Sequence, residues 1–322
     1  MSAQFETPGA TIAAPWRENK GEIGRHAYEA DIPTLLLAAG IYAAFFLTTW
    51  FYHALPWWAV LPLGASIVCL HGSLQHEAVH GYPFKSRRLT RWITGWSLWL
   101  WIPYDVYVKT HTRHHIDQDL TDPFLDPESN YLTEEQWAQM SGLHRAVRQA
   151  MRTLAGRMLL GPGYYTVASI REAARDLTSG DRYRIVPWVW HVFTVAIILT
   201  WVIGVCHIPL WAYVLFFAYP GTSMALVRSY AEHRAAPDEK TRSIICEAGA
   251  FWGFMFLYNN LHALHHAEPA LAWYKRPGRY RQLKARLLSE NGGYFMPGYG
   301  AIARAYLFRP KEPIFHPFKK AS

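Results

Sequence analysis

The chain has 322 residues, of which 51% are hydrophobic and 16% aromatic, and its formal net charge is +8. With fifteen Trp, this composition is typical of a membrane protein with a basic aqueous face, and it makes nucleic-acid binding the weaker interpretation of the charge. The cysteines share no Cys-x-x-Cys spacing, which argues against a disulfide framework or a thiolate metal site; they are Cys69, Cys206 and Cys246.

Residues 1–32 carry charges and contain no apolar core segment, so they predict a cytosolic N-terminal segment without a cleavable signal peptide. Four stretches without Asp, Glu, Lys or Arg follow, each close to the roughly 20 residues needed to cross a bilayer. Short turns join these stretches in pairs, which predicts two hairpins, at 33–75 and 186–227. The stretches are Pro33 to Phe51, Trp57 to Leu74, Val186 to Val205 and Pro209 to Val227.

The basic residues set the predicted orientation. Neither hairpin turn carries a charge, so every Lys and Arg lies on the side of the N-terminus, the central segment 76–185 and the C-terminal segment 228–322. The positive-inside rule assigns that side to the cytoplasm. The sequence therefore predicts a single all-α integral membrane domain with four transmembrane helices in two hairpins, interfacial helices and a cytosolic helical cap. Buried helices of a large soluble protein are the alternative.

Eight of the sixteen histidines fall into three clusters. Neutral imidazole is the commonest protein ligand of transition metals, and residues three or four apart share one face of a helix, so each cluster offers at least two nitrogens to an ion. Eight imidazoles exceed the four ligands of a zinc ion, which favours two metal ions. The alternative is that each cluster is a polar helix end in contact with solvent. The clusters are His76-Glu-Ala-Val-His80, His111-Thr-Arg-His-His115 and His262-Ala-Leu-His-His266.

His233 belongs to no cluster, but it lies at the same predicted depth as the end of the first one. The second and fourth membrane helices begin near Pro56 and Pro209, and at about 1.5 Å per residue His80 and His233 lie equally far along them, just past the cytoplasmic boundary. We therefore include His233 as a ninth candidate ligand, with a surface histidine as the alternative. The other histidines are expected to be structural or exposed: His26, His53, His71, His144, His191, His207 and His316.

Both halves of the chain continue in the same way. His80 and His233 are each followed by a short apolar segment, 89–103 or 244–258, and then by a His-x-x-His-His cluster. These segments are too short to span a bilayer comfortably, so we expect them to form helices that lie in the membrane interface. An ordinary core stripe is the alternative.

Together these features resemble the membrane-bound fatty acid desaturase and hydroxylase superfamily, in its bacterial form, from about Pro33 to Tyr280. The run Asn259-Asn-Leu-His-Ala-Leu-His-His-Ala-Glu-Pro, followed by Trp273 and Tyr274, is similar to the third box of bacterial desaturases and carotenoid ketolases. The resemblance implies two irons at the cytoplasmic side of a bacterial inner membrane, with O2 as co-substrate. The iron ligands that it implies are His76, His80, His111, His114, His115, His233, His262, His265 and His266.

The chemistry implied by the resemblance suits the predicted position of the boxes. An alkyl C–H bond has no acidic proton, so it is opened by an oxidant made from dioxygen and electrons rather than by a base or a nucleophile. A channel between transmembrane and interfacial helices would admit an acyl chain while its head group stays in water. We expect desaturation of a fatty acyl chain, with hydroxylation or ketolation of a lipid or carotenoid as the alternative within the superfamily.

The source of electrons is expected to be another protein. The chain has no His-Pro-Gly-Gly motif and no Gly-x-Gly-x-x-Gly loop, so we expect a separate ferredoxin, rubredoxin or cytochrome. An Arg-rich part of the central segment is a candidate docking face for an acidic carrier. A solvated helix face attracted to anionic lipids is an equal alternative. The arginines are Arg145, Arg148, Arg152, Arg157, Arg171 and Arg175.

Polar residues near the boxes are candidates for orienting the imidazoles through hydrogen bonds. Asp117 and Asp119 follow the second box, whereas Asp122 and Asp126 precede prolines and are interpreted as turn residues. Some desaturases have an asparagine where this chain has Ser229, and an amide near the third box could take its place. The candidates are Glu77, Asp117, Asp119, Ser229, Glu232, Asn259 and Asn260.

Two functions of other classes stay open. His76-Glu77-x-x-His80 matches the signature of zinc metalloproteases, in which two histidines bind zinc and the glutamate is the base. The nearest match to the third ligand of membrane-embedded proteases is Leu125-Asp126-Pro127, which lacks the glycine, and the protease interpretation leaves two boxes unexplained. A non-catalytic metal-binding or transport protein is disfavoured because the four spans contain no Asp, Glu, Lys or Arg.

Overall fold

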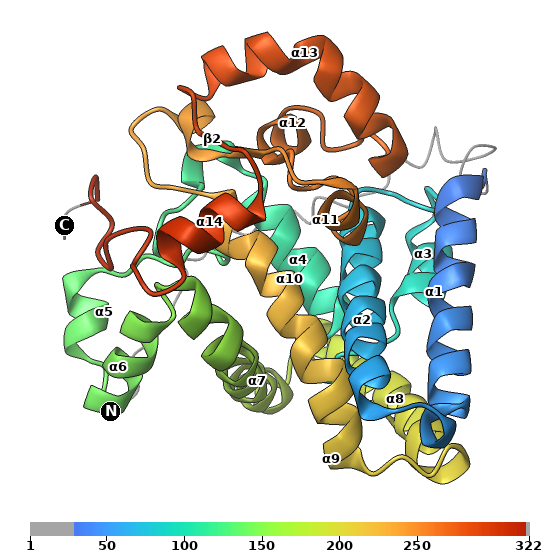
Figure 1. Cartoon of the computed structure of the whole chain (residues 1–322). Coiled ribbons are helices and arrows are strands. Elements are labelled where there is room, and N and C mark those ends of the chain that lie inside the picture. Colours follow the sequence, from blue (N-terminus) through green and yellow to red (C-terminus); the bar gives the residue numbers. More distant parts are fainter. Residues whose placement is uncertain (1–28, 320–322) are drawn as a thin grey trace.

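The computed structural model describes residues 29–319 and is built almost entirely of helices (Figure 1). The prediction about a signal peptide falls on residues outside this range, except at its edge. Two short strands, β1 (Ile245–Cys246) and β2 (Phe295–Met296), pair in parallel. The helices are α1 (Ile32–Trp50), α2 (Trp57–Val79), α3 (Arg87–Thr94), α4 (Tyr104–His114), α5 (Glu134–Ala138), α6 (Gly142–Ala150), α7 (Leu154–Thr178), α8 (Arg182–Leu199), α9 (Leu210–Tyr213), α10 (Tyr219–Glu232), α11 (Ala250–Met255), α12 (His262–Ala267), α13 (Arg276–Glu290) and α14 (Tyr299–Tyr306).

Within residues 29–319, four helical stretches are long and apolar enough to cross a membrane, which confirms the prediction of four spans. Two of them are longer than a single α-helix, because α8 continues through a π-helical turn and α9 continues through another into α10. Exposed tryptophans cluster at the ends of the spans that lie far from α12 and α13, and Trp is enriched at membrane interfaces. They are Trp50, Trp57, Trp58 and Trp211. The spans are Ile32–Trp50, Trp57–Val79, Arg182–Val205 and Leu210–Glu232.

The first span shows why the chain starts a helix where it does. The Asp31 carboxylate accepts a hydrogen bond from the Thr34 backbone N–H at 3.1 Å, and Pro33 lies in the first turn. An acidic cap supplies an acceptor for an N–H that has no partner within the helix, and proline there removes no helical hydrogen bond. The acidic cap and the proline together fix the start of the apolar helix α1 at Ile32.

Helices α2 and α10 lie side by side at the centre of the membrane part (Figure 1). Gly221 of α10 lies so close to α2 that a Cβ atom there would meet the Val68 Cβ at 2.5 Å. Small residues at such an interface let two helix backbones approach, and packing of this kind holds helices together in lipid. Because α2 ends at the first His box and α10 at His233, their contact brings these candidate ligands close together.

The first and the third span differ in how they pack against this central pair of helices. Helix α1 packs against α2 along the membrane part. The third span behaves differently, because α8 packs against α7 and α4 and meets the fourth span at their connecting turn.

Helix α7 brings part of the central segment against the fourth span. Ser223 Oγ of α10 donates a hydrogen bond to the Met158 carbonyl at 2.7 Å, and the Tyr219 hydroxyl donates to the Leu159 carbonyl. The outward face of α7 exposes apolar side chains, among them Leu159 and Ile170. The segment 76–185, which we expected to be a cytosolic cap, therefore includes a helix packed on a membrane-spanning one.

The two segments expected to be interfacial helices are helical only in part. In 89–103, helix α3 ends at Gly95 and an irregular stretch leads to Pro103, before α4. In 244–258, strand β1 comes first and α11 occupies only Ala250–Met255. The apolar pattern is the same in a strand that is buried on both faces as in a short helix, which is why periodicity did not separate them.

The Arg-rich part of the central segment is only partly a surface. Arg148 donates a hydrogen bond to the Asn130 carbonyl at 2.9 Å, and Arg157 to the Met151 carbonyl at 3.2 Å. Both arginines are buried. They hold α6 and α7 to neighbouring loops, so neither is free to meet another protein.

Candidate metal centre

Nine histidines converge in two adjoining groups. They come from the ends of α2, α4 and α10 and from α12, which lies beneath α13 in Figure 1. Within each group, one ring nitrogen from every histidine lies within 4.8 Å of the others. These are the nine histidines that the sequence singled out, and no other histidine of the described residues joins them. One group is His76, His80, His111, His115 and His265, and the other is His114, His233, His262 and His266.

Helix ends place these ligands. His80, His115 and His233 are the residues at which α2, α4 and α10 end, and α12 carries the third box. The C-terminus of a helix carries roughly half a negative charge from its unpaired carbonyl groups, and it favours cations nearby. The convergence of helix C-termini therefore makes the site electrostatically suited to positive ions, in addition to supplying the imidazoles.

In the four-histidine group, the nitrogen spacing fits a single ion. His233 Nε2 lies 3.0 Å from His114 Nε2 and 2.9 Å from His262 Nε2. Two nitrogens bound at about 2.1 Å to one ion, at right angles to each other, are about 3.0 Å apart. His266 Nε2 is buried and has no hydrogen-bond partner among the described residues, as expected of an atom that faces a metal.

The five-histidine group has the same spacing. His115 Nε2 lies 3.1 Å from His111 Nε2 and 3.0 Å from His265 Nε2. His80 Nε2 is buried without a hydrogen-bond partner among residues 29–319. A set of imidazole nitrogens without thiolates suits iron, zinc or copper, so the donors fit the two irons implied by the resemblance without selecting iron.

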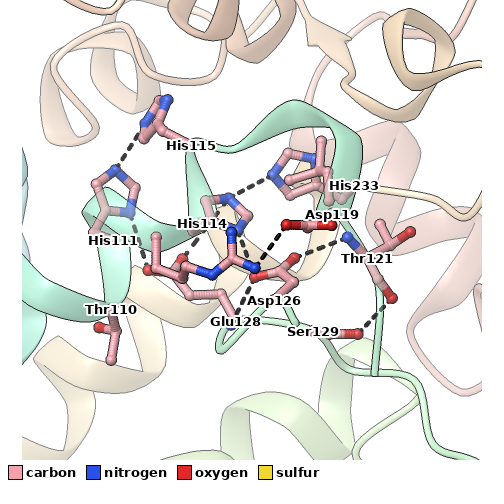
Figure 2. Close-up of polar contacts among 12 residues, drawn as sticks. Thr110, His111, His114, His115, Asp119, Thr121, Asp126, Glu128, Ser129 and His233 are labelled. Carbon is pink, nitrogen blue, oxygen red and sulfur yellow. Dashed lines mark hydrogen bonds and ion pairs between the residues drawn. The ribbon is translucent and has the colours of Figure 1, made fainter. Parts of the chain in front are cut away.

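Carboxylates on the far side of the rings fix which nitrogen faces the metal. Asp126 lies 2.9 Å from His114 Nδ1 and Glu128 lies 3.0 Å from His111 Nδ1 (Figure 2). Asp117 lies 3.0 Å from His266 Nδ1. An Nδ1–H that donates to a carboxylate leaves the Nε2 lone pair for an ion and makes that nitrogen more basic.

The protonation of the rings follows from their surroundings. Burial lowers the pKa of His233, His262 and His265 well below the ordinary value, so these rings are neutral, which is the form that binds metals. His114 is the exception in the metal-free protein. Burial lowers the pKa of His114, but the nearby carboxylates of Glu128 and Asp126 have the larger combined effect and raise this pKa to about 9. A metal ion would take the place of that ring proton.

The predicted hydrogen-bond partners of the ligands lie in different places. Asp117 contacts His266, as described above, and Glu232 Oε1 lies 3.3 Å from His262 Nδ1 and accepts from the Asn259 amide at 3.2 Å. Glu77 lies 3.7 Å from His76 Nδ1, but its main contact is with Arg276. These four candidates surround the centre.

Three other candidates bond elsewhere. Asp119 pairs with Arg113 at 2.6 Å, because its position in a short 3-10 turn directs it away from the rings. The Ser229 hydroxyl donates to the Leu226 carbonyl within α10, and the Asn260 amide donates to the Cys246 carbonyl of β1. Their contacts hold the local backbone rather than an imidazole.

Sequence reasoning missed Glu128 and assigned Asp126 to a turn. Asp126 stabilises the turn and also contacts a ring: it accepts hydrogen bonds from the backbone N–H groups of Thr121 and Glu128 at 2.8 and 2.9 Å, and it contacts His114 (Figure 2). The Asp126-Pro127-Glu128 run was a usable signal, because carboxylates two residues apart in a tight turn are held close together. Arg228, whose side chain is 14% exposed and pairs with Glu232 at 3.2 Å, was not singled out from the sequence.

The arrangement argues against the protease interpretation. Zinc proteases need the glutamate of His-Glu-x-x-His as a base facing the metal. Here Glu77 is fully buried and its carboxylate lies 2.5 Å from the Arg276 guanidinium. Asp126, the nearest match to a third zinc ligand, contacts the outer nitrogen of His114 instead.

In the described part of the chain, four membrane-length spans and two partly buried imidazole groups define a helical membrane protein with a candidate two-metal centre. The family model for fatty acid desaturases matches residues 52–298, so the chain belongs to the fatty acid desaturase family. The match covers all nine histidines. This family consists of oxidoreductases of the desaturase and hydroxylase type, and the chain is an enzyme of that type. A search of curated proteins found no match.

Proposed function

We propose that the chain is an oxygen-dependent di-iron oxidoreductase of the membrane that desaturates a fatty acyl chain. The observation that carries the proposal is the pair of imidazole groups, which offers two ions five and four nitrogen ligands. Family membership supports iron among the metals that such ligands accept. Hydroxylation or ketolation of a lipid or carotenoid is the alternative outcome.

Bound iron would supply the oxidising chemistry with dioxygen that an unactivated C–H bond requires. The residues of the chain hold the ligands in place and keep water away. His76, His111, His114, His262 and His265 are each at most 2% exposed, so the reacting part of a substrate would meet a dry site. The carboxylates of Asp117, Asp126 and Glu128 hold the ring protons on Nδ1.

The atoms balance for either reaction. In desaturation, a –CH2–CH2– unit loses two hydrogen atoms and O2 becomes two waters, which requires two further electrons and two protons. In hydroxylation, one oxygen atom enters a C–H bond, the other becomes water, and the same two electrons and two protons are consumed. We propose that a ferredoxin, rubredoxin or cytochrome supplies the electrons.

An apolar cavity supports an alkyl substrate. A cavity of about 370 Å³ opens between α1 and α2 beneath α11, and among the described residues that line it Ser66 has the one polar side chain. Leu70 of α2 lies in its wall and His76 follows less than two turns later. Its volume lies within the range of about 300–1,000 Å³ that is usual for ligand sites, and its apolar wall suits a hydrocarbon chain taken from the bilayer.

Location and orientation belong to the proposal as well. The charge pattern supports boxes at the cytoplasmic surface of the membrane. The resemblance to bacterial desaturases supports a bacterial inner membrane. A cytoplasmic site would give a soluble electron carrier direct access. Nucleic acid has no part in the proposed reaction.

The test is expression in a host of defined lipid composition with added iron and a reduced carrier, followed by iron analysis and lipid mass spectrometry. We expect two irons per chain and an O2-dependent lipid that lacks two hydrogen atoms; a gain of one oxygen would select the alternative. His265→Ala should abolish the product, whereas His53→Ala should not, because the His53 ring bonds the Cys206 carbonyl at the other end of the spans. Iron-loaded protein that changes no lipid would contradict the proposal.

A further inference from the structure

The two imidazole groups differ in what holds their rings from behind. In the four-histidine group every Nδ1 has a polar neighbour among the described residues. His114 contacts Asp126 at 2.9 Å, His266 contacts Asp117 at 3.0 Å, His262 contacts Glu232 at 3.3 Å and His233 contacts the Ser243 hydroxyl at 3.3 Å. Three of these neighbours are carboxylates.

The five-histidine group has less support. His111 contacts Glu128 at 3.0 Å. In the described part of the chain, Glu128 is the one carboxylate within hydrogen-bond distance of a ring in the five-histidine group. Glu77 lies 3.7 Å from His76, and Arg276 at 2.5 Å neutralises it. His265 Nδ1 is buried and has no hydrogen-bond partner among residues 29–319.

The carboxylates of the four-histidine group differ in exposure and in their own charged partners. Glu232 shares its charge with Arg228 at 3.2 Å, and Asp117 is 52% exposed, so solvent screens it. Asp126 is only 3% exposed, and it faces a ring that is equally buried. Glu128 lies near both groups, because its second oxygen is 4.0 Å from His114 Nε2. Even so, two carboxylates, Asp117 and Asp126, form hydrogen bonds to rings of the four-histidine group, whereas Glu128 alone does so in the other group.

We propose that the two metal positions are inequivalent, and that the four-histidine position binds its ion more tightly although it has one imidazole fewer. The inference rests on the two-metal centre proposed above. A carboxylate behind a ligand histidine fixes its tautomer and rotamer and raises its basicity, and loss of such a partner lowers metal affinity about 10- to 100-fold. With one more hydrogen-bonded carboxylate, and with a polar neighbour at the Nδ1 atom of every ring, the four-histidine position fills first and empties last.

The test is an anaerobic titration of the purified full-length protein with Fe²⁺ against a chromophoric chelator, with metal content measured by elemental analysis. The wild type should release its two irons in two separate steps. In His265→Ala only the tight step should remain, with one iron per chain. Release in one step, or retention of only the weak iron by His265→Ala, would overturn the inference.

Asp117→Asn is the most informative substitution. The side chain of Asp117 is half exposed and its recorded side-chain contact is His266, so the variant should fold normally. It should weaken the tight step about 10-fold, the lower end of the usual range because solvent screens Asp117, and leave the weak step unchanged; Asp117→Glu should recover part of the loss. Glu290→Gln, at an exposed pair with Arg286, is the matched control and should change neither step.

If Asp117→Asn lowered the iron affinity of the weak step and left that of the tight step unchanged, the four-histidine position would not be the tighter one. Failure of the proposed function is distinguishable, because protein that binds two irons in two steps yet alters no lipid would refute the reaction and leave the inequivalence standing.

Discussion

The buried ion pair between Glu77 and Arg276 joins α2 to α13 directly beside the first His box. Glu77 Oε1 lies 2.5 Å from Arg276 Nη1, and both side chains are 0% exposed. Arg276 also donates to the Leu257 carbonyl at 2.9 Å, in the loop that leads to Asn259. Arg276→Met would leave a carboxylate buried without its cation, and loss of one member of such a pair costs about 3–5 kcal/mol.

A double-mutant cycle measures this coupling. Arg276→Met, Glu77→Leu and the double variant are compared with the wild type by reversible unfolding in SDS and lipid-like detergent. Each single substitution should destabilise the protein strongly, whereas the double variant should cost less than the sum of the two, because no unpaired charge remains.

The matched control is Arg286→Met on the same helix, whose side chain is 70% exposed and pairs with Glu290. An exposed pair of this kind contributes little. If Arg276→Met were no more destabilising than Arg286→Met, or if the double variant lost the full sum, the reasoning about this pair would be refuted.

Further predictions concern the cavity, the ligands and acid stability. Gly40→Leu should fill the apolar cavity and lower turnover of an alkyl substrate without loss of iron, because a Cβ at Gly40 meets nothing within 4 Å; Gly204→Leu, on the third span, is the control and should be neutral. His262→Ala should reduce the iron content, whereas His144→Ala should leave it at the wild-type level, since the ring of His144 only approaches the Tyr164 hydroxyl. Hydrogen bonds from Lys284 and Tyr280 lower the pKa of Glu247 below its ordinary value of 4.5. The ionised carboxylate therefore stabilises the folded protein above pH 4.5, and this stabilisation is lost as the pH falls through the lowered pKa. Glu247→Gln should therefore flatten the loss of thermal stability below pH 4.5; an unchanged acid limb would contradict the assignment.

The membrane spans could be predicted from the sequence because they depend on local composition. An uncharged stretch of about 20 residues has few other stable environments, and the four stretches match helices within a few residues at most ends. The fourth span extends past Val227 to Glu232, because Arg228 and Glu232 neutralise each other at its end. The predicted stretch ended at Val227 because it was defined by the absence of charged residues.

His233 was found from helix geometry rather than from a motif. Equal distances along two membrane helices placed it at the depth of His80, and the structure has its Nε2 atom 3.0 Å from that of His114. A constant rise per residue makes such depth arguments possible when both helices cross the same bilayer.

Contacts between distant parts of the chain could not be predicted. Glu77 and Arg276 are brought together only by the placement of α13, and nothing in their local sequences marks them as partners. The pairing of β1 with β2 is similar, because two-residue strands have no periodicity to detect. Asp126 was identified with a turn because proline follows it, and its second contact with His114 depends on how the turn packs on α4.

We propose that nine imidazoles from distant parts of the chain hold two irons. Iron K-edge X-ray absorption of the purified protein, combined with elemental analysis, measures both the number of irons and their ligands. We expect two irons per chain, each with four or five imidazole nitrogens and no sulfur ligand. A single ion per chain, zinc in place of iron after iron-replete growth, or a sulfur ligand would contradict it.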